Sequence, residues 1–410
     1  MSRELTWRDT QKACYLGYIS QAVVINLPSL LFVTFQRDYG VSLTKLSGLI
    51  ALLFVVQIIV DFVSAPIVDR VGYRACSVVG FGLCVAGLGL LSVLPRVMSS
   101  AYAGLAIAMT VASVGSGLME VLISPITESL PMEDKGGAMS LLHSFYCWGL
   151  VGVVVLSTGY FAVFGTENWP YLPLLWALVP LTGLAAFLRV PMYQLAEAGR
   201  TMTMGGILKQ PVFWLLFAVM ICAGASEQSM CQWASLFAEK GLGVSKTVGD
   251  LMGPCAFAAM MGCGRVFFGT GKGSKWPVER ALTVCAALCV ACYLMAALSP
   301  WPGMALAGCA VCGFSVGVMW PGTLTLASGR MPLGGTAMFA LLALGGDVGC
   351  SAGPALVGLV ADALSGGVAQ AADESMRTGF LFALIFPAAL MGSVAMIHKM
   401  NGKRKRSAAE

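Results

Sequence analysis

Four acidic residues lie inside long apolar stretches of this 410-residue sequence: Asp61, Glu120, Glu227 and Asp347. A charged group at the centre of a lipid bilayer costs about 2.5–3.5 kcal/mol even on the lenient insertion scale, so it persists where it faces water or has a partner. A carboxyl group takes up and releases a proton and accepts hydrogen bonds from polar molecules. These four acids are therefore the first candidates for chemistry.

Glu120 has the most informative surroundings of the four. Ser116 and Ser124 lie four residues before and after it, and Ser113 lies one further turn away, within a segment of Ala, Val, Leu and Gly. On a helix this spacing makes one narrow polar stripe. Such a stripe predicts a helix that lines a wet cavity, and the alternative is a polar seam that joins two helices.

His143 is the only histidine inside an apolar stretch. A histidine titrates near neutral pH, which suits a proton carrier or a hydrogen-bond donor. We expect that His143 can pair with Glu120 across adjacent helices, although a hydrogen-bonded packing role is an equally good interpretation. The residues predicted to carry coupling protons are Glu120, His143, Glu227 and Asp347.

Asp347 lies among glycines at close spacing, at positions 345, 346, 349 and 353. Small residues four apart make a groove in which two membrane helices approach closely. A carboxylate buried in that groove needs a partner or a proton, so Asp347 is either a coupling site or a structural hydrogen-bond acceptor.

A second polar group lies near positions 227–233, where acidic, amide and indole side chains follow one another. Groups of this kind orient a polar solute, and the alternative is the solvated end of a helix. Aromatic rings stack on solutes but also fill apolar cores. The residues predicted to contact a solute are Gln21, Asn26, Glu120, His143, Tyr146, Trp148, Glu227, Gln228, Gln232, Trp233 and Trp320.

The elements that position these residues follow from composition. Hydrophobic residues make up 58% of the chain and charged residues 11%, whereas soluble domains carry about 25% charged residues. A bilayer core takes about 20 apolar residues per helix, and the apolar stretches do not alternate as barrel strands do. We therefore predict an all-α membrane protein with twelve spans, at about 13–35, 44–67, 75–95, 100–127, 138–163, 168–190, 211–238, 247–269, 281–299, 302–328, 336–363 and 378–398.

Basic residues are distributed unequally between the two sides of this arrangement. With the N-terminus inside, 19 of the 25 Lys and Arg residues lie in cytosolic segments and 6 in outer segments. This bias is typical of the positive-inside rule. It predicts cytosolic termini, a multi-pass protein of the cell (inner) membrane, and a basic tail at 401–410 that sets topology. The lipid bilayer is an expected partner and nucleic acid is not. The polar N-terminus does not resemble a signal peptide.

The cysteines do not indicate a cofactor. Nearly all of the 14 lie in apolar stretches, as small core residues do. Cys309 and Cys312 form a Cys-x-x-Cys pair, but metal and redox sites recruit further ligands, and the chain has only two histidines. We expect no cofactor and no metal.

The two halves of the sequence echo one another. Pro125 and Pro131 precede a Gly-Gly-Ala-Met segment, and Pro321 and Pro332 precede a Gly-Gly-Thr-Ala-Met segment. Repeats of this kind are typical of transporters. We expect an N-terminal six-helix half at 1–190, a cytosolic linker at 191–210 and a C-terminal six-helix half at 211–400.

The loop after the second span reads Asp69-Arg70-Val71-Gly72-Tyr73-Arg74. It resembles the signature loop of the major facilitator superfamily, at the same place between helices two and three. Ala65 stands where the family has its first glycine, and Tyr73 where it has its first basic residue. The resemblance implies a charge cluster that closes the cytosolic side, formed by the gating residues Asp61, Asp69, Arg70, Gly72, Arg74, Glu128 and Arg265.

Within that superfamily the chain is most similar to the fucose permease branch of sugar/proton symporters. The similarity lies in Glu120 and in the segment from Gly224 to Trp233. Where those symporters have an acid in span one, this span offers Tyr18, Gln21 and Asn26. The resemblance implies a monomeric secondary active transporter that couples a small polar solute to protons by alternating access.

Other functions remain open at this point. Sodium is a possible coupling ion, because carboxylates and helix carbonyls also bind it. Export of hydrophobic compounds by proton antiport is the main alternative within transport, and a sensor with this fold is another. An enzyme would need paired acids with a metal or a nucleophile beside a base. It is disfavoured, because the chain has no acid-rich loop and no second histidine in an apolar stretch.

Overall fold

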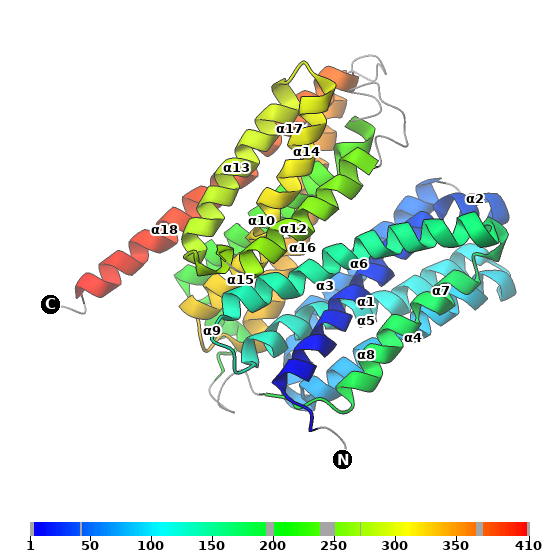
Figure 1. Ribbon diagram of the computed structural model, residues 1–410, viewed down its shortest axis with the longest axis horizontal. Coiled ribbons are helices and arrows are strands. Elements are labelled where there is room, and N and C mark those ends of the chain that lie inside the picture. Colours follow the sequence, from blue (N-terminus) through cyan, green and yellow to red (C-terminus); the bar gives the residue numbers. More distant parts are fainter. Residues whose placement is uncertain are drawn as a thin grey trace. The chain divides into compact units, whose positions relative to one another are not determined.

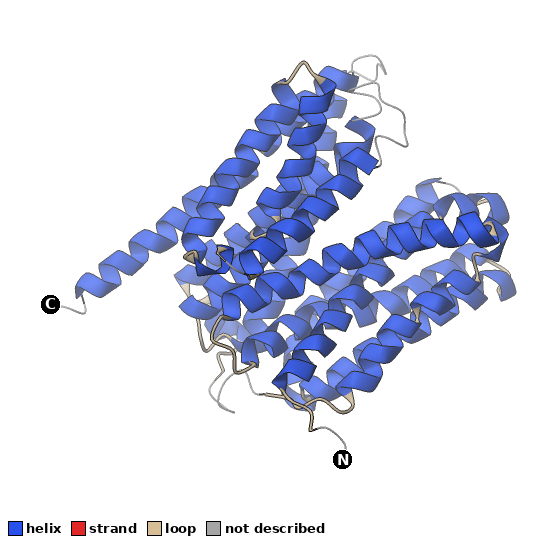
Figure 2. Ribbon diagram, in the orientation of Figure 1, coloured by secondary structure: helices blue, strands red, loops and turns tan. Residues whose placement is uncertain are grey.

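The computed structural model describes residues 4–41, 43–193, 201–237, 251–270, 272–365 and 372–407. These residues form helices and loops, without a strand among them (Figure 2). Positions 194–200 of the expected linker, 247–250 of the expected eighth span and 408–410 of the tail lie outside the described residues.

The helices of the first part of the chain run through the blue-to-green ribbon of Figure 1. Their bounds are α1 Trp7–Leu30, α2 Phe32–Tyr39, α3 Leu43–Val71, α4 Tyr73–Val97, α5 Ala101–Ser129, α6 Lys135–Phe164, α7 Tyr171–Trp176 and α8 Leu178–Phe187.

The helices of the second part run from green to red in Figure 1. Their bounds are α9 Met204–Leu208, α10 Pro211–Leu236, α12 Ala256–Gly269, α13 Val278–Leu298, α14 Pro302–Val316, α15 Met319–Arg330, α16 Gly335–Ser365, α17 Ala372–Ala383 and α18 Ile385–Ser407.

Each predicted span coincides with one helix or with two consecutive ones. Nine helices or helix pairs in the described part of the chain are long and apolar enough to cross a membrane. The other three predicted spans contain the shorter apolar helices Leu52–Ser64, Tyr171–Phe187 and α12. The prediction of an all-α membrane protein is therefore confirmed.

The chain forms two compact units. The first unit comprises Met1–Glu133, Phe145–Thr201 and Gly335–Ala340. The second comprises Asp134–Ser144, Met202–Gly334 and Leu341–Glu410. The start of α6 therefore belongs to the second unit and the start of α16 to the first.

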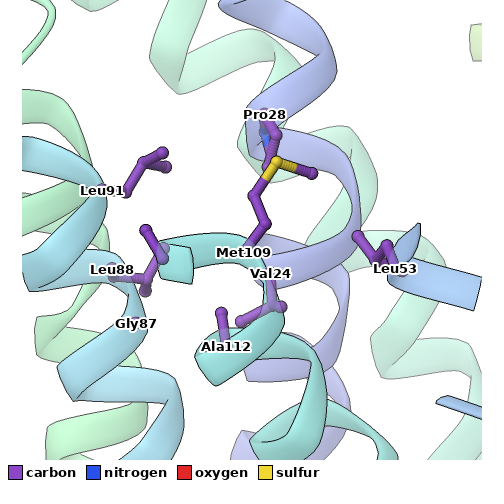
Figure 3. A pocket seen from close by; sticks show the side chains of 9 residues that line it. Val24, Pro28, Leu53, Gly87, Leu88, Leu91, Met109 and Ala112 are labelled. Atoms are coloured by element: carbon purple, nitrogen blue, oxygen red, sulfur yellow. The ribbon is translucent and has the colours of Figure 1, made fainter. Parts of the chain in front are cut away.

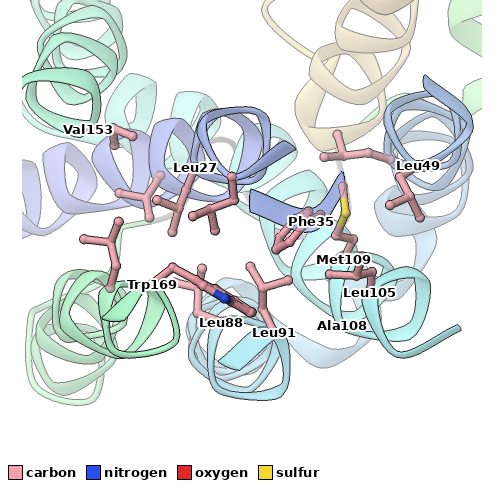
Figure 4. Packing of buried hydrophobic residues seen from close by; sticks show 14 of the residues in the cluster. Leu27, Phe35, Leu49, Leu88, Leu91, Leu105, Ala108, Met109, Val153 and Trp169 are labelled. Carbon is pink, nitrogen blue, oxygen red and sulfur yellow. The ribbon is translucent and has the colours of Figure 1, made fainter. Parts of the chain in front are cut away.

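The core of the first unit is an apolar cluster contributed by α1 to α7 and the loops between them (Figure 4). Phe35 and Leu27 are fully buried there, beside Trp169. The ring of Trp169 meets that of Phe35 edge to face at 5.3 Å, and its Nε1 donates to Asp38 at 3.1 Å. This cluster holds the helices that carry the polar residues of the first unit.

Glycines let helices of each unit approach closely. A Cβ added at Gly87 of α4 would lie 2.5 Å from Ala112 of α5. In the second unit, a Cβ at Gly349 of α16 would overlap the carbonyl oxygen of Ile221 in α10. The glycine groove predicted around Asp347 is thus a helix contact, as small residues in membrane helices usually are.

Candidate functional sites in the two units

A carboxylate with two amide donors lies inside the first unit. Nε2 of Gln21, on α1, donates to Oε2 of Glu120, on α5, at 2.6 Å. Nε2 of Gln57, on α3, donates to the same oxygen. Gln21 and Gln57 are 4% and 2% exposed. Three helices therefore converge on one carboxyl group. The serine stripe had indicated a polar surface on α5 only.

Gln57 was missed by sequence reasoning. Its signal was available, because it is the only glutamine in the second span and lies one turn before Asp61. Asp61 itself is fully buried. The two residues make a polar edge on α3, and sequence alone does not show which helix that edge meets.

The polar side of α1 continues on both sides of Gln21. Tyr18 shares a hydrogen bond of 2.9 Å with Ser124 of α5. The Asn26 amide donates to the backbone of Ala22 at 2.8 Å and lies 3.5 Å from the hydroxyl of Tyr146. Asn26 and Tyr146 are thus brought together. Trp148, also predicted to contact the solute, is 40% exposed.

A nearby pocket of the first unit is apolar (Figure 3). Val24 and Pro28 line it from α1, and Leu53, Gly87, Leu88, Leu91, Ala108, Met109 and Ala112 complete it. Its lining contains no hydrogen-bonding side chain.

The second unit contains a buried ion pair. Nη2 of Arg265, on α12, lies 3.3 Å from Oε2 of Glu227, on α10, and the two side chains are 4% and 11% exposed. Arg265 was expected near the cytosolic side among gating residues. The structure places its guanidinium beside Glu227, which was expected to bind solute or protons, and the gating role of Arg265 stays a prediction.

Arg265 also satisfies backbone carbonyls at two other elements. Its Nε donates to Gly317 at 3.2 Å and its Nη1 to the carbonyl of His143 at 3.0 Å. Pro321 has no N–H for the carbonyl four residues earlier, which is that of Gly317. The arginine thus supplies the donor that the proline removes, at the break between α14 and α15.

The first turns of α6 pack against the segment of α12 that contains Arg265. Ser140 donates to the backbone carbonyl of Arg265 at 2.8 Å, and His143 is 3% exposed. Glu227, Arg265 and His143 therefore lie together within the second unit, whereas Glu120 lies in the first.

The remaining predicted solute residues of the second unit differ in their exposure and contacts. Trp233 donates through Nε1 to the carbonyl of Pro354 at 3.0 Å, while Gln232 is exposed and Gln228 is half-buried. A Cβ at Gly346 would overlap the ring of Trp320. Trp233 and Trp320 therefore pack against α16.

Asp347 is 4% exposed. Its backbone carbonyl accepts a hydrogen bond from Ser351 at 3.0 Å. Its position on α16 beside α10 keeps it a candidate coupling residue of the second unit.

The loop from Asp69 to Arg74 contacts the start of α16, which the family resemblance did not imply. Gly72 has φ +92°, which favours glycine. Tyr73 hydrogen-bonds Thr336 at the start of α16, and Thr336 donates to Asp69 at 3.3 Å. All four residues belong to the first unit.

Arg74 binds the end of α8. It donates to the carbonyls of Phe187 at 2.9 Å and Val190 at 2.7 Å. Such contacts satisfy carbonyls that a helix end leaves unpaired. Arg70 is exposed and Glu128 half-buried, and their predicted gating contact stays a prediction.

The cysteines are free thiols, and those of α13 and α14 are buried. Cys289 and Cys312 have their sulfurs 3.8 Å apart. Among the described residues no group of three or more His, Cys, Asp or Glu side chains is arranged for a metal.

Comparison with solved structures supports one fold for the whole chain. The E. coli fucose:proton symporter FucP is 15% identical with a TM-score of 0.75, over 94% of this chain and 99% of that one. The proton:xylose symporter XylE is 14% identical with a TM-score of 0.73, over 94% and 96%. The human organic anion transporter MFSD10 is 15% identical with a TM-score of 0.69, over 94% and 100%.

No curated protein matches the sequence. The family model of the Major Facilitator Superfamily matches residues 14–354, which is most of the chain. Together with the apolar helices, this match establishes that the chain is a multi-pass membrane transporter that belongs to the Major Facilitator Superfamily.

Proposed function

We propose that the chain is a proton-coupled symporter of a small polar solute, a sugar or a molecule of similar polarity. The observation that supports it best is the Glu120 carboxylate, which accepts amide hydrogen bonds from Gln21 and Gln57 inside the first unit. A carboxyl group that is hydrogen-bonded to side chains on two other helices links its own protonation to the position of those helices.

Coupling follows from the charge of Glu120. When the carboxylate is ionised, the two amide N–H groups solvate it. When a proton arrives, the carboxyl gains one O–H donor, so one amide turns its oxygen toward it while the other can still donate. A solute that binds better to the protonated arrangement shifts the population toward it, so proton and solute move together.

Two observations support a hydroxyl-rich solute. FucP and XylE are named as symporters of protons with fucose and xylose. In this chain the first unit offers Asn26 beside Tyr146, and the second offers Gln228 and Gln232. Amide and phenol groups bind hydroxyl-rich solutes. The halves 1–190 and 211–400 are proposed to rock about the linker as a monomer.

Charge movement in proteoliposomes tests this proposal. The protein is reconstituted on a solid support in sodium-free buffer and challenged with pooled sugars, amino acids and organic acids at two pH values. We expect a solute-evoked inward current that depends on pH, is lost in Glu120→Gln and persists in Glu133→Gln, because Glu133 is exposed.

Two results would contradict symport. One is a solute current of equal size in Glu120→Gln. The other is no current with any pool while cells still extrude hydrophobic dyes in a protonophore-sensitive manner, which would establish export by antiport instead.

A further inference from the structure

The segment that joins α12 to α13 carries three exposed basic side chains. Lys272, Lys275 and Arg280 are all exposed, and within the described part of the chain none of them belongs to an ion pair. The acid of this segment is Glu279, and its carboxylate is already paired with Arg330 of α15. The three basic side chains therefore present positive charge that no described carboxylate neutralises.

A tight turn places the two lysines together. Gly273–Lys275 form a single 3₁₀ turn whose N-cap is Lys272. Side chains three residues apart eclipse one another in a 3₁₀-helix, so Lys272 and Lys275 lie on the same side of this turn. Gly273 is buried, and a Cβ there would overlap the carbonyl oxygen of Phe267. The turn is thus packed directly against the end of α12.

Trp276 follows the turn and has one apolar and one charged neighbour. Its ring meets that of Phe268 edge to face at 6.1 Å. The guanidinium of Arg280 lies over the same ring, 5.2 Å from its centre, and the indole is 37% exposed. Tryptophans with an apolar body and a polar side are enriched where the bilayer meets water. This environment is typical of a residue at the level of the lipid headgroups.

The exposed face of α12 leads from the bilayer to this turn. Cys263 and Phe267 are both exposed, and they share one face because they are four residues apart on a helix. In a membrane protein such an exposed apolar face contacts lipid chains. A phospholipid whose chains lie along it brings its phosphate to Lys272 and Lys275. A soluble phosphate would make no use of Phe267 or Trp276.

The helix α18 adds positive charge beside the turn. Nδ1 of His398, on α18, lies 2.6 Å from Oε2 of Glu279, at the start of α13. The next residue of α18, Lys399, is exposed. Two elements of the second unit therefore contribute basic side chains to the same end of its helices.

We infer that the turn between α12 and α13 binds the headgroup of an anionic phospholipid. Lys272, Lys275 and Arg280 contact the phosphate, and Trp276 packs beside the glycerol backbone. Each Lys or Arg near an anionic membrane surface strengthens binding about fivefold. A zwitterionic headgroup carries a cation of its own, which the three basic side chains repel, so the site favours lipids with net negative charge.

Titration of purified protein with lipid tests this site without any transport. The full-length protein in detergent receives phosphatidylglycerol or, separately, phosphatidylcholine with the same acyl chains, and its thermal unfolding midpoint is measured. A ligand that binds the folded state raises the midpoint in a concentration-dependent manner. We expect phosphatidylglycerol to raise it and phosphatidylcholine not to do so. About 1 M NaCl should weaken the effect, because it shortens the Debye length to about 3 Å.

A triple variant removes the three charges. In Lys272→Gln, Lys275→Gln, Arg280→Gln we expect the apparent affinity for phosphatidylglycerol to be about a hundredfold lower, as three fivefold contributions predict. If the triple variant does not fold, Lys275→Gln alone should lower the affinity about fivefold. Wild-type affinity in the folded triple variant, or in Lys275→Gln, contradicts the site.

A matched control removes two lysines and one arginine elsewhere. Lys12, Lys209 and Arg189 are also exposed, and their joint replacement by glutamine should leave the affinity at the wild-type value. Three further outcomes overturn the assignment: equal stabilisation by phosphatidylcholine, an equal loss of affinity in the control, or equal stabilisation by glycerol phosphate without acyl chains. The last of these would identify a soluble phosphate as the ligand instead of a lipid.

Discussion

Arg265 shows how a single side chain joins four elements of the second unit. It pairs with Glu227 of α10 and donates to carbonyls at Gly317 and His143. A planar guanidinium carries five N–H donors on three nitrogen atoms, so separate atoms reach the three acceptors, whereas a lysine offers a single nitrogen. Arg265 therefore stabilises the bend of span ten and also neutralises the charge of Glu227.

At this scale we predict that Arg265→Gln destabilises the protein by about 3–5 kcal/mol, because it leaves a buried carboxylate without its counter-charge. The double variant with Glu227→Gln should recover most of that loss. Thermal unfolding of the two single variants and the double variant measures the coupling between them. Additive losses would mean that the pair contributes no interaction of its own.

At the scale of elements, glycine contacts decide which helices meet. The seam between α10 and α16 places Gly349 against the carbonyl of Ile221 and Gly353 against Ala225. The helix α16 also carries Asp347 and contacts Trp233 and Trp320.

We predict that Gly349→Ala destabilises the protein by about 1–3 kcal/mol, since the added methyl forces the two backbones apart. The matched control is Gly392→Ala in α18, where a Cβ would meet nothing within 4 Å. Unfolding midpoints of the two variants in detergent provide the comparison. Equal midpoints would show that the seam tolerates a wider spacing.

At the scale of the whole molecule, the distribution of basic residues predicts how the chain lies in the membrane. The 19 to 6 division of Lys and Arg places the loops before span one and after span twelve on the cytosolic side. An alternating-access transporter needs this fixed orientation, because its coupling gradient has a direction.

Reporter fusions test that topology. A fluorescent protein joined after Glu410 should fluoresce, and alkaline phosphatase joined there should be inactive. The same phosphatase joined after Ser99, between the third and fourth spans, should be active because the positive-inside rule places that loop outside. Activity at both positions, or only at the C-terminus, would contradict the orientation.

The sequence by itself determined that this protein lies in a lipid bilayer, where its helices run and to which family it belongs. A composition of 58% hydrophobic and 11% charged residues is incompatible with a water-facing surface. Runs of about twenty apolar residues set the span boundaries, and the loop from Asp69 to Arg74 indicated the superfamily. Local patterns suffice for these properties, because backbone hydrogen bonds within a bilayer must be made inside each helix.

Only the tertiary structure decided the partners of the polar groups. The stripe on α5 predicted that Glu120 faces something polar, but not that Gln57 of α3 reaches it. Arg265 was assigned to gating by its place in the chain, and only the structure shows that its guanidinium pairs with Glu227. Such partners are separated by 38 or more residues. Their meeting depends on helix rotation and on close glycine contacts, which no local pattern specifies.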